Sequence, residues 1–150
     1  MKRVLIIDAL NAYLRAYIVD PSLSANGVPI GGLKGFVKIL QKLVRTTNPG
    51  NVIVVWDGPN GSRKRKDMDK KYKAGRKPIR LNRSFHNLTD DEELQNKIYQ
   101  QSRIIEYLNE MPVIQFMLPE IEADDVIAHI TQLSTYDGWQ KIVVSNDKDF

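Results

Sequence analysis

Four short apolar runs, spread along the chain, constrain its fold more than any other feature of the sequence. They read KRVLIIDA from residue 2, NVIVVWDG from 51, PVIQFML from 112 and KIVVS from 141. Runs of this length that are rich in Val and Ile are typical of strands buried on both faces of a parallel sheet. Helical patterns separate them. Strands that alternate with helices predict an α/β protein with a three-layer α/β/α fold around a mostly parallel central sheet.

The helical patterns have recognisable starts and stops. Residues 32–50 end in Asn-Pro-Gly, a second helix opens at TDDEEL with Thr89 and Glu92 in capping-box spacing, and a third begins in EADDVIAHITQL. A chain of 150 residues is long enough for one apolar core, so we expect a single domain over residues 1–150. The stripes predicted to face the core are Leu33, Phe36, Val37, Leu40, Leu43 and Val44 in the first helix and Leu94, Ile98, Ile105 and Leu108 in the second.

Acidic residues follow the predicted strands. The carboxyl ends of parallel strands share one edge of a sheet, and ligands bind there. A single acid at such a place is often a helix cap, but carboxylates that converge from several strand ends repel one another unless a cation lies between them. Oxygen-only ligands favour a hard divalent ion, Mg²⁺ or Mn²⁺, over zinc. The candidate ligands are Asp8, Asp57, Glu122, Asp124, Asp125, Asp147 and Asp149.

The positive charge of the chain is concentrated in one segment. Residues 63–83 hold eleven Lys and Arg against two Asp, so the rest of the chain is net negative although the whole carries +4. Clustered Lys and Arg bind phosphate backbones, whereas an isolated basic run is often only a solvated loop. A basic segment directly after an acidic strand end indicates phosphodiester hydrolysis, in which two metal ions about 4 Å apart activate water and stabilise the leaving oxygen.

Composition excludes several other classes of site. The chain has no Cys and only two His, His86 and His129, which rules out disulfides and thiolate chemistry and disfavours zinc. No apolar stretch reaches the roughly 18 residues that span a bilayer, and Asp8 interrupts the N-terminal apolar run, so no signal peptide is expected. We therefore expect an intracellular, cytoplasmic protein with no membrane partner.

Six motifs in order resemble the 5′ nucleases, a family that includes flap endonucleases, phage 5′-to-3′ exonucleases of the RNase H type and the 5′ nuclease domain of bacterial DNA polymerase I. LIIDALNAYLRAY is similar to the first acidic strand of the family, and VVWDG to the second. NGVPIGGLKGF resembles its glycine-bearing helix start, RKDMDKKYKAGR its arch motif, EADDVIA its acidic helix start and SNDKDF its paired aspartates. The resemblance runs from about residue 3 to residue 150.

This resemblance implies a role for each group of residues. The seven acids would hold two divalent ions, with Asp124 and Asp147 essential for cleavage. Within a basic arch segment of about 58–92, Lys73 and Arg76 would contact the scissile phosphate, and Tyr72 would stack on a base. The alternative for Tyr72 is a place in the core of an arch helix. The other predicted DNA-binding residues are Arg63, Lys64, Arg65, Lys66, Lys70 and Lys71, which attract or touch phosphate, and Gly31, Gly32 and Gly35 at the DNA junction. Relief of crowding at a helix start would also explain these three glycines.

The resemblance also implies a substrate and a missing part. The expected partner is DNA with 5′ flaps or 5′ ends, or RNA–DNA hybrids, in replication or repair. In the family a helix-hairpin region follows the paired aspartates and adds ligands for the second metal. That region is absent after Phe150. Three explanations remain open: the chain is truncated, a separate partner chain supplies the region, or the protein has a reduced activity. In each case we expect one metal site to be nearly complete. Two alternatives remain: a PIN-type ribonuclease and a non-catalytic DNA-binding module.

Overall fold

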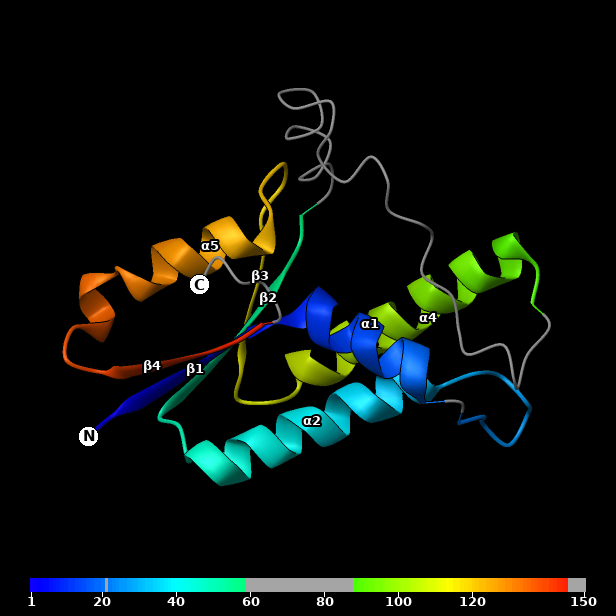
Figure 1. Cartoon of the computed structure of the whole chain (residues 1–150), viewed down its shortest axis with the longest axis horizontal. Helices are drawn as coiled ribbons and strands as arrows, with labels where there is room; N and C mark the ends of the chain where they lie inside the picture. Colours follow the sequence, from blue (N-terminus) through cyan, green and yellow to red (C-terminus); the bar gives the residue numbers. More distant parts are fainter. Residues whose placement is uncertain (21, 59–87, 146–150) are drawn as a thin grey trace. The chain divides into compact units, whose positions relative to one another are not determined.

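The computed structural model describes residues 1–20, 22–58 and 88–145 (Figure 1). These residues belong to two compact units. A sheet unit contains the strands, α5 and the short 3₁₀ helix η1, and a helical unit contains most of α1 and α2 together with α4. The elements are β1 (Arg3–Asp8), α1 (Ala9–Val19), α2 (Gly31–Thr47), β2 (Asn51–Trp56), α4 (Asp90–Asn109), β3 (Ile114–Met117), α5 (Ala123–Thr131), η1 (Ser134–Tyr136) and β4 (Gln140–Val144).

In the described part of the chain the sheet has four strands in the order β3-β2-β1-β4, and every neighbouring pair is parallel. The prediction of an α/β fold with a mostly parallel sheet is therefore confirmed. β3 is shorter than predicted, four residues long, and among the described residues it lies at an edge of the sheet, paired with β2 alone. Its apolar residues Ile114, Phe116 and Met117 remain about 40% exposed.

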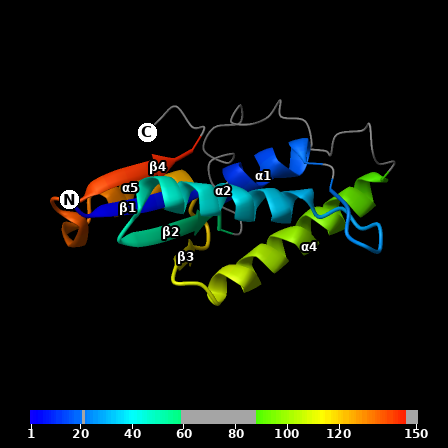
Figure 2. The same ribbon diagram turned by 90° about the horizontal axis from the view of Figure 1, so that it is seen from below.

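The core of the sheet unit is apolar, and α5 packs over one face of the sheet (Figures 1 and 2). Alternate strand residues contact the helix, because successive side chains in a strand point to opposite faces. The intervening residues of β1 and β2, among them Leu5, Ile7 and Val54, are also fully buried, as predicted for strands buried on both faces. The cluster on the α5 side consists of Val4, Ile6, Ile53, Val55, Ala123, Val126, Ile127, Ile130 and Tyr136.

In the helical unit, α4 does not bury the apolar stripe that was predicted to face the core. Leu94 and Ile98 are about half exposed, and the helix instead buries Glu93, Asn96, Gln100, Ile104 and Leu108. Of the predicted positions only Leu108 is fully buried, and Ile105 is partly buried. The capping box at Thr89 and Glu92 is confirmed by both of its hydrogen bonds.

The buried polar residues of α4 have partners, which is why the helix can turn this face inward. Tyr17 of α1 donates a short hydrogen bond to the Glu93 carboxylate. Gln100 accepts from the backbone amide of Leu33 at 2.9 Å and donates to Asn96 at 2.7 Å. Asn96 in turn donates to the carbonyl of Pro29 at 3.1 Å. These bonds join α4 to the start of α2, and the helices of this unit lie side by side in Figure 2.

α1 is an element that the motif-based interpretation did not separate from the first strand. It begins at Ala9, directly after β1, with no turn between them. Its buried residues Ala12, Tyr13, Ala16 and Tyr17 repeat every four residues, which is helical spacing. The boundary has no Gly or Pro, and Asp8, which precedes the helix and is of a residue type that often caps one, was interpreted as a candidate metal ligand instead.

Candidate metal centre

The parallel register brings the acidic strand ends to one edge of the sheet. Asp8, the last residue of β1, pairs with Val55 of β2, and Asp57 follows β2 by one residue. On the other side Ile7 pairs with Val144, the last residue of β4. The predicted convergence of strand ends at this edge is therefore confirmed for the strands that carry Asp8 and Asp57.

Hydrogen bonds fix both of these aspartates, which are partly buried. The hydroxyl of Ser145, just beyond β4, donates to Asp8 Oδ2 at 3.1 Å. The backbone amide of Ala123, the first residue of α5, donates to Asp57 Oδ1 at 2.7 Å. Asp57 therefore connects β2 to the helix that carries three other candidate ligands. No pattern in the sequence pointed to Ser145 or Ala123, because both contacts join residues far apart in the chain.

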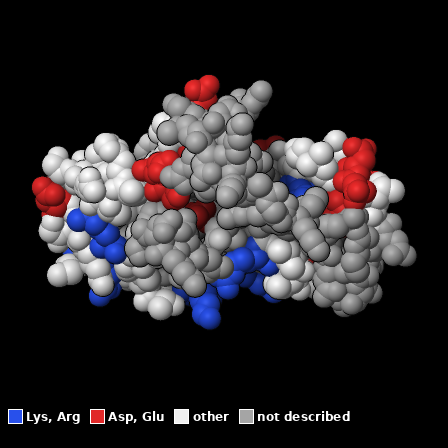
Figure 3. Space-filling view, turned by 45° about the horizontal axis from the view of Figure 1, so that its top comes forward, with Lys and Arg blue, Asp and Glu red and all other residues white. Residues whose placement is uncertain are grey.

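The other described candidate ligands lie at the beginning of α5. Glu122 occupies the N-cap position and is only 4% exposed. Asp124 is partly buried and accepts from the amide of Asp125 at 2.9 Å, whereas Asp125 is exposed. Carboxylates at a helix N-terminus are favoured by the helix dipole. Figure 3 shows acidic side chains near this end of α5.

Among residues 1–20, 22–58 and 88–145, no group of three acidic or His side chains is arranged closely enough to hold a metal ion. Asp147 and Asp149 lie outside the described residues. The composition of the candidate set nevertheless fits a hard divalent ion, because each member offers only carboxylate oxygens. The complete ligand set therefore stays a prediction.

Most of the predicted DNA-binding residues fall within 59–87, outside the described part of the chain. Their roles therefore also stay predictions. These residues are Arg63, Lys64, Arg65, Lys66, Lys70, Lys71, Tyr72, Lys73 and Arg76.

The three predicted junction glycines lie in tightly packed backbone at the start of α2. A Cβ on Gly31 would lie 1.7 Å from the carbonyl oxygen of Asp20, and one on Gly35 would lie 2.7 Å from the Cβ of Ala16. A Cβ on Gly32 would meet the ring of Tyr13 at 2.5 Å. The packing explanation for these glycines is thus supported, whereas contact with DNA stays a prediction.

Within the described residues no helix is long and apolar enough to cross a membrane.

Comparisons with known proteins cover almost the whole chain. It is 34% identical over its full length to "Flap endonuclease Xni" of Shewanella piezotolerans, and 29% identical over 99% of its length to "5′-3′ exonuclease" of Aquifex aeolicus. It spans about half the length of these relatives, 51% and 47%.

A solved structure of the T5 D15 protein co-crystallised with metal ions matches 99% of this chain and 50% of its own, with a TM-score of 0.70 at 18% identity. A T5 D15 flap endonuclease complex with DNA and metal ions matches with a TM-score of 0.68 at 19% identity. At such identities the likeness concerns the fold. The family model for the 5′-3′ exonuclease N-terminal, resolvase-like domain matches residues 3–150, and the chain therefore belongs to that family.

Proposed function

We propose that this chain is the catalytic domain of a divalent-metal-dependent 5′ nuclease that hydrolyses phosphodiester bonds in DNA. The observation that carries the proposal is the acidic edge of the sheet, where Asp8 and Asp57 end neighbouring strands and Asp57 is bonded to the acidic start of α5. Family membership and relatives named as flap endonuclease and 5′-3′ exonuclease support it. Because those relatives are about twice as long, the activity of the complete enzyme is itself part of the proposal.

Mg²⁺ or Mn²⁺ is the ion that suits an all-carboxylate site. When bound, two such ions would supply an activated water and stabilise the leaving oxygen. The residues that would hold them are Asp8, Asp57, Glu122, Asp124 and Asp125, together with Asp147 and Asp149.

The protein must also overcome the repulsion between its acidic edge and a polyanion. We assign this role to the basic segment, in which Lys73 and Arg76 would lie beside the scissile phosphate and Tyr72 would stack on a base. α2 offers further positive charge, since it carries Lys34, Lys38, Lys42 and Arg45 and no acid. Lys and Arg side chains are exposed along this helix in Figure 3. Substrates would be 5′ flaps, 5′ ends or RNA–DNA hybrids.

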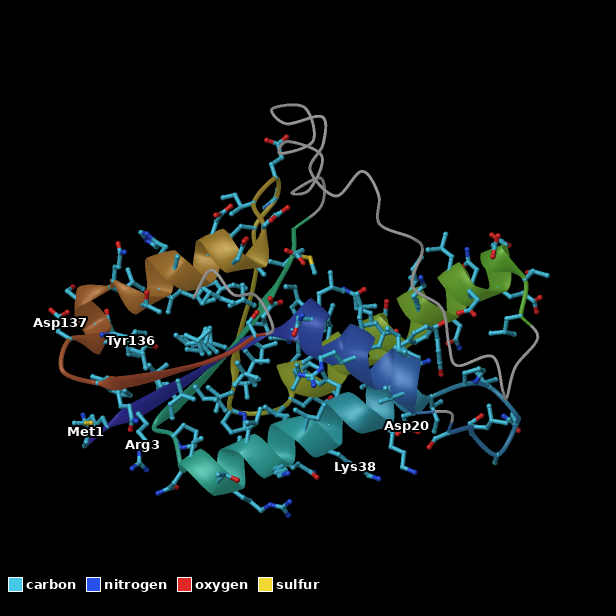
Figure 4. All side chains as sticks on the ribbon, in the orientation of Figure 1. Met1, Arg3, Asp20, Lys38, Tyr136 and Asp137 are labelled. Carbon is cyan, nitrogen blue, oxygen red and sulfur yellow. The ribbon has the colours of Figure 1, made fainter. Side chains whose placement is uncertain are left out.

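Replacing one candidate ligand tests the proposal. Asp124→Asn keeps the size of the side chain and removes its charge, so cleavage of a 5′-flap DNA in Mg²⁺ should fall about 100-fold or more while thermal unfolding is nearly unchanged. Asp137→Asn is the matched control, because Asp137 lies before the start of β4, at the opposite end of the strands (Figure 4).

Equal cleavage by Asp124→Asn and the unsubstituted chain would contradict the proposal. Preferential cleavage of single-stranded RNA would favour a PIN-type ribonuclease instead. Flap DNA that is bound but left uncut at saturating Mn²⁺ would favour a non-catalytic DNA-binding module.

A further inference from the structure

The backbone just after β2 lies very close to the chain that leads into α5. The amide of Gly58 donates to the carbonyl of Ile121 at 3.1 Å, and Asp57 Oδ1 accepts from the amide of Ala123 at 2.7 Å. A Cβ at position 58 would lie 1.6 Å from the carbonyl oxygen of Leu118 and 2.5 Å from its carbon. These distances are far shorter than any contact between packed atoms. Only glycine at position 58 therefore lets the backbone after β2 lie this close to Leu118.

Asp57 also supplies a cap that α5 lacks in its own sequence. Glu122 has the extended backbone of an N-cap residue, with φ −75° and ψ 153°, but its side chain makes no capping hydrogen bond. The first amides of a helix have no partner within the helix and need an acceptor. Asp57 provides one from a neighbouring strand by binding the amide of Ala123. The carboxylate just after β2 therefore caps the first residue of α5.

We propose that Asp57 and Gly58 form a clamp that positions the acidic start of α5 for divalent-metal binding. The clamp consists of two hydrogen bonds, Asp57 Oδ1 to Ala123 and Gly58 to Ile121. This inference rests on the proposed function, and it makes Gly58 a positioning residue although it has no side chain to offer a ligand. A metal site built from separate elements needs its ligands held to within about 0.5 Å, and the clamp joins two such elements directly.

Gly58→Ala tests the clamp without removing any carboxylate. The new methyl group must push the 118–123 segment away from β2, so we expect Mn²⁺ to bind about tenfold or more weakly in titration calorimetry. Ile130→Ala is the matched control, because Ile130 is 3% exposed in the same helix but eight residues beyond Glu122. This control should lower stability while Mn²⁺ affinity, measured well below the unfolding temperature, stays within about twofold of the unsubstituted chain.

Two substitutions of Asp57 test the clamp even if Gly58→Ala fails to fold. Asp57→Asn keeps a side-chain oxygen that can accept from Ala123, whereas Asp57→Ala removes it. Hydrogen exchange of the Ala123 amide, followed by NMR, should remain slow in Asp57→Asn and become about fivefold or more faster in Asp57→Ala, the size expected for a lost cap. A residue that acted only as a metal ligand would not produce this difference in the metal-free protein.

The outcomes separate the clamp from the proposed function. Equal Mn²⁺ affinity of Gly58→Ala and Ile130→Ala would overturn the positioning role, and so would equal Ala123 exchange in the two Asp57 variants. If the unsubstituted chain binds no Mn²⁺, the metal-dependent function is contradicted, and the clamp is then decided by Ala123 exchange alone.

Discussion

The interior of the sheet unit is almost entirely apolar, whereas the interior of the helical unit combines apolar side chains with hydrogen-bonded polar ones. In the sheet unit the interior is formed by Val and Ile from β1 and β2 and by the apolar face of α5. In the helical unit α4 places Glu93, Asn96 and Gln100 inside and leaves Leu94 and Ile98 about half exposed. Burial of the first kind depends on apolar area, whereas burial of the second kind depends on satisfied hydrogen bonds.

This difference explains where each unit tolerates change. Apolar packing has no direction, so the sheet unit can adjust to small losses of volume. The helical unit depends on directional bonds and on glycines that let backbones meet, such as Gly31 against Asp20. Apart from Gly58 of the sheet unit, whose added Cβ would also meet backbone, the largest effects of single substitutions are therefore expected in the helical unit, at positions that look unremarkable in the sequence.

Within the helical unit, Gly31→Ala should have the largest effect on stability. Helix propensity alone would make this change favourable by about 1 kcal/mol. The added Cβ, however, would lie 1.7 Å from the carbonyl oxygen of Asp20, which is backbone and cannot rotate away. We expect a loss of about 3 kcal/mol or more in the free energy of unfolding, measured by urea denaturation. Lys42→Ala, at an exposed position of the same helix, is the control and should change stability by less than about 0.5 kcal/mol.

Gln100→Leu tests whether the polar interior of α4 is required. The substitution adds an apolar side chain to a fully buried site, which would be harmless if burial there were hydrophobic. It also leaves the amide of Leu33 and the side chain of Asn96 without their Gln100 partner. We expect a loss of about 2 kcal/mol by denaturation.

The opposite exchange on the exposed side of α4 is the control for Gln100→Leu. Leu94→Gln replaces an apolar side chain that is 51% exposed, so stability should change by less than about 0.5 kcal/mol. A larger loss in Leu94→Gln than in Gln100→Leu would mean that α4 buries its apolar stripe after all.

The sequence predicted the strands better than the helices, for a physical reason. A short β-branched run such as Val52 to Val55 is typical of a strand buried on both faces of a parallel sheet, and acids at the ends of parallel strands lie at one edge of that sheet. The buried face of α4 could not be predicted, because Glu93 and Gln100 become suitable core residues only through partners in α1 and α2. For the same reason the sequence indicated Asp57 as a ligand but not its bond to Ala123.

Glu120 offers a smaller test, in the turn that leads from β3 to α5. Its φ is 63°, and the amide of Ile121 donates to the carbonyl of Leu118 at 3.3 Å, with Pro119 between them. These are features of a type II turn, which favours glycine at the position of Glu120. Glu120→Gly should therefore be about 1 kcal/mol more stable than Glu120→Ala in thermal denaturation. Equal stability of the two variants would show that the left-handed backbone is not retained in solution.

Asp20 is labelled in Figure 4 at the end of α1. Its substitution should have the smallest effect on stability, and that effect should depend on pH. Burial raises its pKa, but two hydrogen bonds from Ser22 and the nearby Lys34 and Lys38 outweigh burial and hold the pKa below its usual value. A lowered pKa in the folded state means that the carboxylate stabilises the fold above the unfolded pKa, near 3.9. That contribution is lost as the pH falls through the folded pKa.

Asp20→Asn should therefore be less stable than the unsubstituted chain at pH 6 by a few tenths of a kcal/mol, since solvent screens this partly exposed group. The difference should shrink in urea denaturation as the pH is lowered from 5 toward 2. Lys34→Gln separates the two causes, because it removes one cation and leaves the hydrogen bonds from Ser22 in place. If the gap between Asp20→Asn and the unsubstituted chain stays constant over this pH range, the Asp20 carboxylate is not stabilised by these neighbours in solution.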